Sequence, residues 1–209
     1  MIATVILAAG EGRRLGGDSK PLIKVAGETL AARSLGAALA AGTAPVLVLS
    51  YQAEEVVRML ERECAERLRS SQLVTVRGSG QGTPEMAASF RAGVQRAADL
   101  GAAQIAVLLV DQPGIGAPAL RAVLEAHDPG RVTRGAVFGR ASHPVVFDTD
   151  DALAAAGQAE GDEGARRYLR AHEERVCVVD LTGVARDADL DTPQDLAAWS
   201  AEPHRSGPW

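Results

Sequence analysis

Residues 4–21 read TVILAAGEGRRLGGDSKP, a short apolar run followed by a glycine-rich loop that ends in a lysine. The β-branched start is typical of a buried strand. Glycines have no Cβ, so the loop can turn sharply and approach a ligand closely. Free N–H groups in such a loop bind anions, and Arg14 and Lys20 add positive charge. The stretch predicts a nucleoside triphosphate site at the carboxyl end of the first strand.

Two better-known glycine motifs do not fit this loop. A dinucleotide fingerprint needs G-x-G-x-x-G, whereas Gly10, Gly12 and Gly16 give a spacing one residue longer. A P-loop needs a Gly-Lys pair, and the sequence has none. The alternative is an ordinary strand-to-loop turn with surface charges. The added arginine and lysine favour the phosphate site.

The segment LAAGEGRRLGGDSKPL resembles the signature L-A-A-G-x-G-x-R-[ML]-G-x-x-K of the MobA-like nucleotidyltransferases. This family includes the molybdenum cofactor cytidylyl- and guanylyltransferases. The resemblance extends through later segments to about residue 199. It implies an α/β fold, a three-layer αβα sandwich of the nucleotidyltransferase (nucleotide-diphospho-sugar transferase) type. It also implies nucleotide binding by Leu7, Ala8, Ala9, Gly10, Gly12, Arg14 and Lys20.

Composition limits the class of protein. The chain has 209 residues, 46% of them hydrophobic but only 3% aromatic, so the core must be built from Ala, Val and Leu. A net charge of −5 argues against nucleic acid as a partner. Without an apolar run of transmembrane length or a signal peptide, we expect no membrane partner and a cytoplasmic location. We expect one domain over residues 1–200 and a flexible tail at 201–209.

Strand-like and helix-like runs alternate along the chain. Strands are predicted at 4–7, 45–50, 73–77, 104–110, 145–147 and 176–180. Helices are predicted at 30–41, 53–69, 84–100, 118–126, 164–172 and 192–199. This order predicts a mainly parallel sheet with helices on both faces, and ligands bind such sheets at the carboxyl ends of the strands.

An aspartate ends the buried run IAVLLVDQP at residues 105–113. A carboxylate there could hold Mg²⁺, which bridges triphosphate oxygens, or it could simply occupy a turn. The resemblance selects Asp111 as a metal ligand, because family members carry an aspartate followed by proline two residues on.

A second acidic group lies in DADLDTPQDL at residues 187–196, which resembles the family's D-[IVL]-D-T-P-E-D-L. Asp189 and Asp191 point to one side in an extended chain, so either could complete a Mg²⁺ site with Asp111. We favour Asp191. The alternative is that these acids only cap the following helix, which is the role expected for Asp195.

Two segments resemble the family's acceptor side. SHPVVF at residues 142–147 is similar to G-[HN]-P-V-x-F, and EGDEGAR at 160–166 contains G-D-x-G-A-R. The resemblance implies that His143, Asp162 and Arg166 bind the acceptor. A structural imidazole and a local salt bridge between Asp162 and Arg166, four residues apart, are equally open alternatives.

Residues 85–93, EMAASFRAG, resemble the cytidylyltransferase run G-M-S-S-S-L-R-A-G but depart from it. Glu85 replaces glycine, and Ala87 and Ala88 replace serines, so two hydroxyl donors are lost. The identity of the nucleotide base and the identity of the acceptor therefore both stay open. Just upstream, Gly82 is a candidate to face the base through its backbone, and a plain loop is the alternative.

The reaction implied by the resemblance is attack of an acceptor phosphate on the α-phosphorus of a nucleoside triphosphate, with pyrophosphate leaving. Arg14 would hold the outer phosphates and Lys20 would stabilise charge at the α-phosphate, so both are candidate catalytic residues. CTP is the expected donor and molybdopterin the expected acceptor, with a molybdoenzyme or its maturation chaperone as a further partner. The alternatives are a guanylyltransferase using GTP, a sugar-phosphate nucleotidyltransferase, or a non-catalytic nucleotide- or cofactor-binding module.

Overall fold

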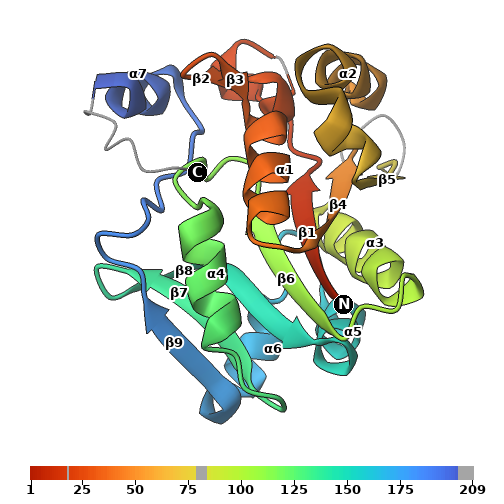
Figure 1. The fold of residues 1–209 in the computed structure, drawn as a ribbon, viewed down its shortest axis with the longest axis vertical. Helices are drawn as coiled ribbons and strands as arrows, with labels where there is room; N and C mark the ends of the chain where they lie inside the picture. The colour runs from red at the N-terminus through yellow and green to blue at the C-terminus, as the bar shows by residue number, and fades with distance from the viewer. Residues whose placement is uncertain (18, 79–83, 202–209) are drawn as a thin grey trace.

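The apolar start of the chain forms the middle of a seven-stranded sheet (Figure 1). The structure is a computed structural model, and it describes residues 1–17, 19–78 and 84–201. The strand order is β5-β4-β1-β6-β8-β7-β9. The strands are β1 Ile2–Ala8, β4 Ala44–Leu49, β5 Gln72–Thr75, β6 Gln104–Leu109, β7 Val132–Val137, β8 Arg140–Asp148 and β9 Val176–Asp180. A separate small hairpin joins β2 (Lys24–Val25) to β3 (Glu28–Thr29).

Helices connect most of these strands. In the described ranges the α-helices are α1 Leu30–Ala40, α2 Ala53–Arg69, α3 Met86–Asp99, α4 Ala117–Glu125, α5 Thr149–Gln158, α6 Arg166–Ala171 and α7 Pro193–Ala201. Short 3-10 helices cover Arg13–Leu15, Lys20–Leu22 and Glu173–Arg175. No helix in the part of the chain that the structure describes has the length and apolarity to cross a bilayer.

The sheet is mainly parallel, as predicted. β1 pairs in parallel with β4 and β6, β4 with β5, and β7 with β9. The exception is β8, which runs antiparallel to both of its neighbours, β6 and β7. Parallel strands end at the same edge of a sheet, so the segments that follow β1, β4 and β6 meet there.

The two faces of the sheet carry two separate apolar clusters, which give the three layers. Alternate residues of β1 point to opposite faces, and so Ile6 joins the cluster under α1, α2 and α4. Its neighbour Val5 joins the cluster under α3, α5 and α6. The predicted αβα sandwich is therefore confirmed. Ala, Val and Leu dominate both clusters, although Phe90 and Phe147 are the largest fully buried side chains.

Helix α3 lies very close to the central strands, and Gly93 permits this. A Cβ placed on Gly93 would lie 2.5 Å from a methyl group of Val5 and 2.8 Å from one of Val48. Real Cβ atoms do not approach other atoms so closely, so only glycine allows this separation between α3 and the sheet.

The structure adds elements that sequence patterns did not predict. Strand β7 was missed because Thr133, Arg134 and Gly135 interrupt its apolar character. Strand β8 is longer than the predicted 145–147, since it pairs along its length with two partners. The predicted helices at 84–100 and 164–172 begin two residues later, at Met86 and Arg166. The expected flexible tail lies outside the described residues, apart from its first residue, which ends α7.

Candidate active site

The glycine loop follows β1 and is held in shape by its own backbone. The carbonyl oxygen of Gly12 accepts hydrogen bonds from the N–H groups of Leu15 at 2.8 Å and Gly17 at 3.1 Å. Gly16 and Gly17 have φ values of +99° and +88°, in the left-handed region that favours glycine. At the end of the loop, the N–H of Ser19 donates to the side-chain oxygen of Gln52 at 2.9 Å. The loop is thus fastened to the segment that follows β4.

Lys20 lies between the two aspartates predicted to hold a metal. Its Nζ is 2.6 Å from Oδ2 of Asp111 and also forms a short ion pair with Oδ1 of Asp191. These three residues come from segments far apart in the sequence. Burial favours a lower pKa for Lys20, but the charges and hydrogen bonds of Asp111 and Asp191 outweigh it and raise the pKa. Lys20 is therefore a cation shared by two carboxylates.

The structure distinguishes Asp191 from Asp189. Asp191 contacts Lys20 and so faces Asp111, whereas Oδ1 of Asp189 accepts a hydrogen bond from Nε2 of Gln112 at 2.9 Å. Between them, Leu190 is buried, and its N–H donates to the backbone oxygen of Asp111 at 2.9 Å. Burial raises the pKa of Asp189, and the charges of Asp111 and Asp191 add to that rise. Asp191 is thus the better placed partner for Asp111.

Asp195 has the capping role that was expected for it. Its Oδ2 accepts hydrogen bonds from the N–H of Thr192 at 2.7 Å and from the N–H of Asp191 at 3.1 Å. In return, Oγ1 of Thr192 accepts from the N–H of Asp195 at 3.2 Å. This reciprocal pair is a capping box at the start of α7. It also restrains the backbone that carries Asp191.

The donor set suits a divalent cation. Carboxylate oxygens of Asp111 and Asp191 converge on one positive charge, the Lys20 ammonium group. Mg²⁺ is commonly held by one or two carboxylates, with substrate phosphates and waters completing its ligands. In the described ranges no group of three or more His, Cys, Asp and Glu residues is placed to hold a metal by itself. A metal at Asp111 and Asp191 would therefore depend on oxygens from substrate and water, and Lys20 would have to shift.

His143 on β8 is connected to Asp189 through Gln112. Because the amide nitrogen of Gln112 donates to Asp189, its oxygen faces His143, whose Nδ1 lies 3.1 Å away. Nδ1 must then carry the proton. Burial and the positive charge of Arg134 lower the pKa of His143 to about 4. His143 is a neutral imidazole, and its Nε2 is the unprotonated nitrogen.

His143, Asp162 and Arg166, the predicted acceptor-binding residues, line one cavity of about 550 Å³. The alternative of a local salt bridge is wrong, since Asp162 precedes α6 and no described ion pair joins it to Arg166. Oδ1 of Asp162 instead accepts from the N–H of Met86 at 3.4 Å, at the start of α3. Sequence analysis missed Arg134, which lines the same cavity, because the strand that carries it was not predicted.

The other predicted nucleotide-binding residues lie near β1. Ala8 and Ala9 are buried at the carboxyl end of the strand, and Leu7 lines the cavity with His143. A Cβ atom added to Gly10 would lie 3.5 Å from Cδ of Lys20, so the start of the loop lies against the lysine side chain. Arg14 is exposed and pairs with no carboxylate in the described ranges. Gly82 lies outside the described residues.

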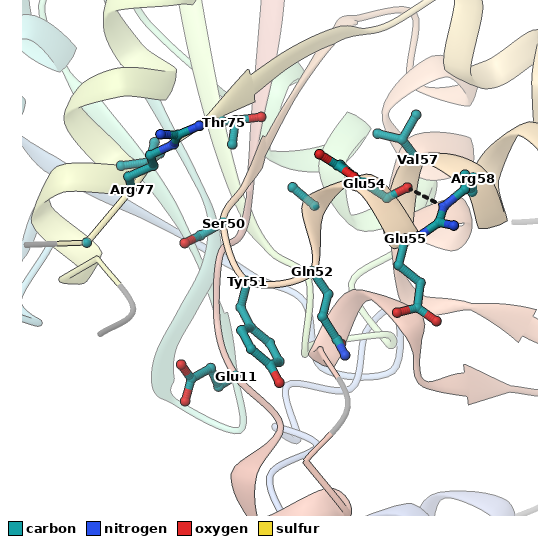
Figure 2. Close-up of a pocket in the computed structure, with 13 residues that line it drawn as sticks. Glu11, Ser50, Tyr51, Gln52, Glu54, Glu55, Val57, Arg58, Thr75 and Arg77 are labelled. Atoms are coloured by element: carbon teal, nitrogen blue, oxygen red, sulfur yellow. Dashed lines mark hydrogen bonds between the residues drawn. The ribbon is translucent and has the colours of Figure 1, made fainter. Parts of the chain in front are cut away.

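A second, larger opening of about 1120 Å³ borders the glycine loop at Glu11 (Figure 2). It lies at the carboxyl ends of β4 and β5 and includes the start of α2. In Figure 2 the ring of Tyr51 reaches toward Glu11, and Arg77 lies on the opposite side. The structure also places Arg77 and Glu54 at this opening.

Comparison with known proteins agrees with this architecture. The family model described as the MobA-like NTP transferase domain matches residues 4–176. "Nicotine blue oxidoreductase" of Paenarthrobacter nicotinovorans is 30% identical over 93% of this chain and 94% of its own length. "Probable molybdenum cofactor guanylyltransferase" of Opitutus terrae is 35% identical over 56% of this chain and 50% of its own.

Among solved structures, Rv0371c from Mycobacterium tuberculosis superposes with a TM-score of 0.79 at 25% identity, covering 96% of this chain and 97% of that one. The family match covers most of the chain, including the glycine loop, Asp111 and His143. The chain therefore belongs to the MobA-like NTP transferase family and is an enzyme of the nucleotidyltransferase class.

Proposed function

We propose that the protein transfers a nucleoside monophosphate from CTP to a phosphate-bearing acceptor, in a reaction that depends on Mg²⁺. The observation that carries this proposal is the cluster of Lys20, Asp111 and Asp191 beside the glycine loop. It combines a cation with two carboxylates at the sheet edge where the parallel strands end. Nucleotidyl transfer needs positioning and charge neutralisation there, and it needs no protein nucleophile.

The loop and Lys20 would hold the triphosphate. Apart from the N–H groups of Leu15 and Gly17, which bond to Gly12, the loop N–H groups and the exposed guanidinium of Arg14 would bind the β- and γ-phosphates. Lys20 would leave its carboxylate partners and follow the α-phosphate. A Mg²⁺ held by Asp111 and Asp191, when bound, would neutralise phosphate charge and orient the leaving group.

The acceptor would enter the cavity of His143, Asp162 and Arg166. A phosphate oxygen of the acceptor forms the new bond to the α-phosphorus, and the bond from that phosphorus to the bridging oxygen of pyrophosphate breaks. The molybdenum cofactor relative supports molybdopterin as the acceptor class. A molybdoenzyme or its maturation chaperone would then receive the product.

GTP is the second candidate donor, because the relative from Opitutus terrae is named a guanylyltransferase. Ala9, which makes the loop read L-A-A-G, favours CTP, while Glu85 and Ala87 depart from the cytidylyltransferase run. A thermal-shift series with CTP, GTP, ATP and UTP decides between the donors. We expect the largest stabilisation with CTP, and a larger shift with GTP would assign a guanylyltransferase.

An oxidoreductase activity is a separate candidate, favoured by the name of the relative from Paenarthrobacter nicotinovorans. The glycine spacing of this chain does not match a dinucleotide fingerprint, which favours nucleotidyl transfer. The two are distinguished by assaying one preparation for pyrophosphate release from CTP or GTP with molybdopterin as the acceptor, and for oxidation of a reduced nicotinamide dinucleotide.

The test of the proposal is the metal dependence of triphosphate binding. Calorimetric titration of CTP and GTP should show tighter binding with Mg²⁺ than without it. We expect Asp111→Asn to abolish this difference, because a neutral amide is a poor Mg²⁺ ligand. The matched control is Asp99→Asn, at the end of α3, whose side chain is bound to Gln95. Unchanged Mg²⁺ dependence in Asp111→Asn would remove Asp111 from the metal site.

A further inference from the structure

The cavity lined by His143 contains two arginines that have no counter-ion. The Nε atom of Arg134, on β7, is buried and has no hydrogen-bond partner. Arg166 begins α6 and lines the same cavity. Within the described ranges neither arginine forms an ion pair. By contrast, Arg170 on the same cavity is paired with Glu163 at 3.0 Å.

The positive charges of Arg134 and Arg166 repel each other. Burial lowers the pKa of Arg134, and the positive charge of Arg166 lowers it further. His143 is neutral, so the arginines supply the positive charge at this part of the cavity. A buried, unpaired guanidinium N–H costs free energy. An anion bound beside Arg134 would satisfy that N–H and remove the repulsion between the two arginines.

The rest of the cavity is largely apolar, so the ligand should carry more than an anion. Its apolar walls come from α3 and from strands β1, β6 and β8, and their buried members are Leu7, Phe90, Val107, Val145 and Phe147. A cavity of about 550 Å³ lies within the range of roughly 300–1,000 Å³ that is usual for small-molecule sites. An aromatic or fused ring fits such walls.

We propose that Arg134 binds the anionic group of the acceptor, so that this cavity selects a ring-bearing phosphate over a neutral ring. The identification of the ligand as the acceptor rests on the proposed function, whereas the anion site rests on the cavity alone. The planar guanidinium fork matches the geometry of phosphate and carboxylate oxygens. Arg134 thereby determines specificity and positions the acceptor's anionic group.

The experiment titrates the wild-type protein with 1-naphthyl phosphate, 1-naphthoate, 1-naphthol and inorganic phosphate. We expect 1-naphthyl phosphate to bind more tightly than 1-naphthol, which lacks the charge, and than inorganic phosphate, which lacks the ring. Comparing 1-naphthoate with 1-naphthyl phosphate distinguishes a site that prefers phosphate from one that binds any anion on a ring. Equal binding of 1-naphthol and 1-naphthyl phosphate would overturn the proposal.

Variants then locate the anion. We expect Arg134→Met to weaken 1-naphthyl phosphate binding about 10- to 100-fold, the usual worth of hydrogen bonds to a charged group. The control Arg170→Met removes an arginine already paired with Glu163 and should change binding less than about threefold. Arg14→Met tests the glycine loop as a competing site. Loss of binding in Arg14→Met but not in Arg134→Met would overturn the assignment.

Two further measurements distinguish a loss of anion binding from a loss of folding, and the anion site from the proposed function. If Arg134→Met does not fold, Arg134→Lys retains the charge and lacks the guanidinium fork, and we expect it to bind 1-naphthyl phosphate more weakly than wild type. Undiminished binding in Arg134→Lys would contradict the role of the fork. Pyrophosphate release from CTP or GTP, with molybdopterin as the acceptor, is measured on the same variants. Anion binding through Arg134 without pyrophosphate release would leave this site standing and reject the proposed function.

Discussion

At the scale of single residues, Lys20 pairs with Asp111 and Asp191, and the proposed reaction would require it to leave both. We expect Lys20→Ala to lower turnover by about a hundredfold or more, because interactions that strengthen in the transition state affect rate more than affinity. Triphosphate affinity should fall only modestly, since the loop N–H groups remain. Lys24→Ala is the matched control, as Lys24 is exposed on the small hairpin. Pyrophosphate release with molybdopterin as the acceptor is the readout, and near-wild-type turnover in Lys20→Ala would reject the catalytic role.

His143 makes stability depend on pH. Its pKa is about 4 in the folded protein, below roughly 6.5 in an unfolded chain. As pH falls below the unfolded value, the unfolded chain takes up a proton that the folded protein does not, so stability is lost until the pH passes the folded pKa. We expect wild type to lose about 1–2 kcal/mol more than His143→Gln between pH 7 and pH 5. Urea unfolding at both pH values measures this, and equal losses would contradict it.

At the scale of elements, the contact of α3 with the sheet depends on a missing side chain. Gly93→Ala would place a Cβ against Val5 and Val48, and we expect a loss of about 1–3 kcal/mol from overpacking. Gly157→Ala in α5 is the control, because no atom lies within 4 Å of its Cβ position. There we expect a gain of about 0.5–1 kcal/mol from the better helix propensity of alanine. Thermal melts compare the two, and equal effects would show that space at Gly93 is not limiting.

At the scale of the whole molecule, the carboxyl-terminal segment carries Asp191 back to the sheet edge. Trp199 secures it: its ring is buried and lies 4.1 Å from the guanidinium carbon of Arg186. We expect Trp199→Ala to cost about 3–5 kcal/mol and to weaken Mg²⁺-dependent triphosphate binding, because Asp191 loses its support. Trp199→Phe should cost much less, since the indole N–H has no partner to lose. Calorimetry and melting curves test both variants. Unaltered Mg²⁺-dependent triphosphate binding in a folded Trp199→Ala protein would show that Trp199 does not support the site.

Local pattern predicted most of the helices and strands in order and, together with the family resemblance, named the residues of the central cluster. Three segments could be interpreted from the residues next to them in the sequence. They are the apolar run before Gly10, the buried run before Asp111 and the acidic residues around Asp191. Resemblance to a known family connected them. Buried strands and glycine-rich loops can be predicted from sequence because they depend mainly on residues close together in the chain.

Only the tertiary structure decided how distant segments meet. It showed that Lys20 is shared by both carboxylates, that Asp189 turns to Gln112, and that Arg134 stands unpaired beside Arg166. Strand β7, which carries Arg134, was hidden because polar residues and a glycine interrupt it and its pairing partners supply its order. Contacts across the sheet depend on chain segments far apart, and their energies have no signature in any short window of sequence.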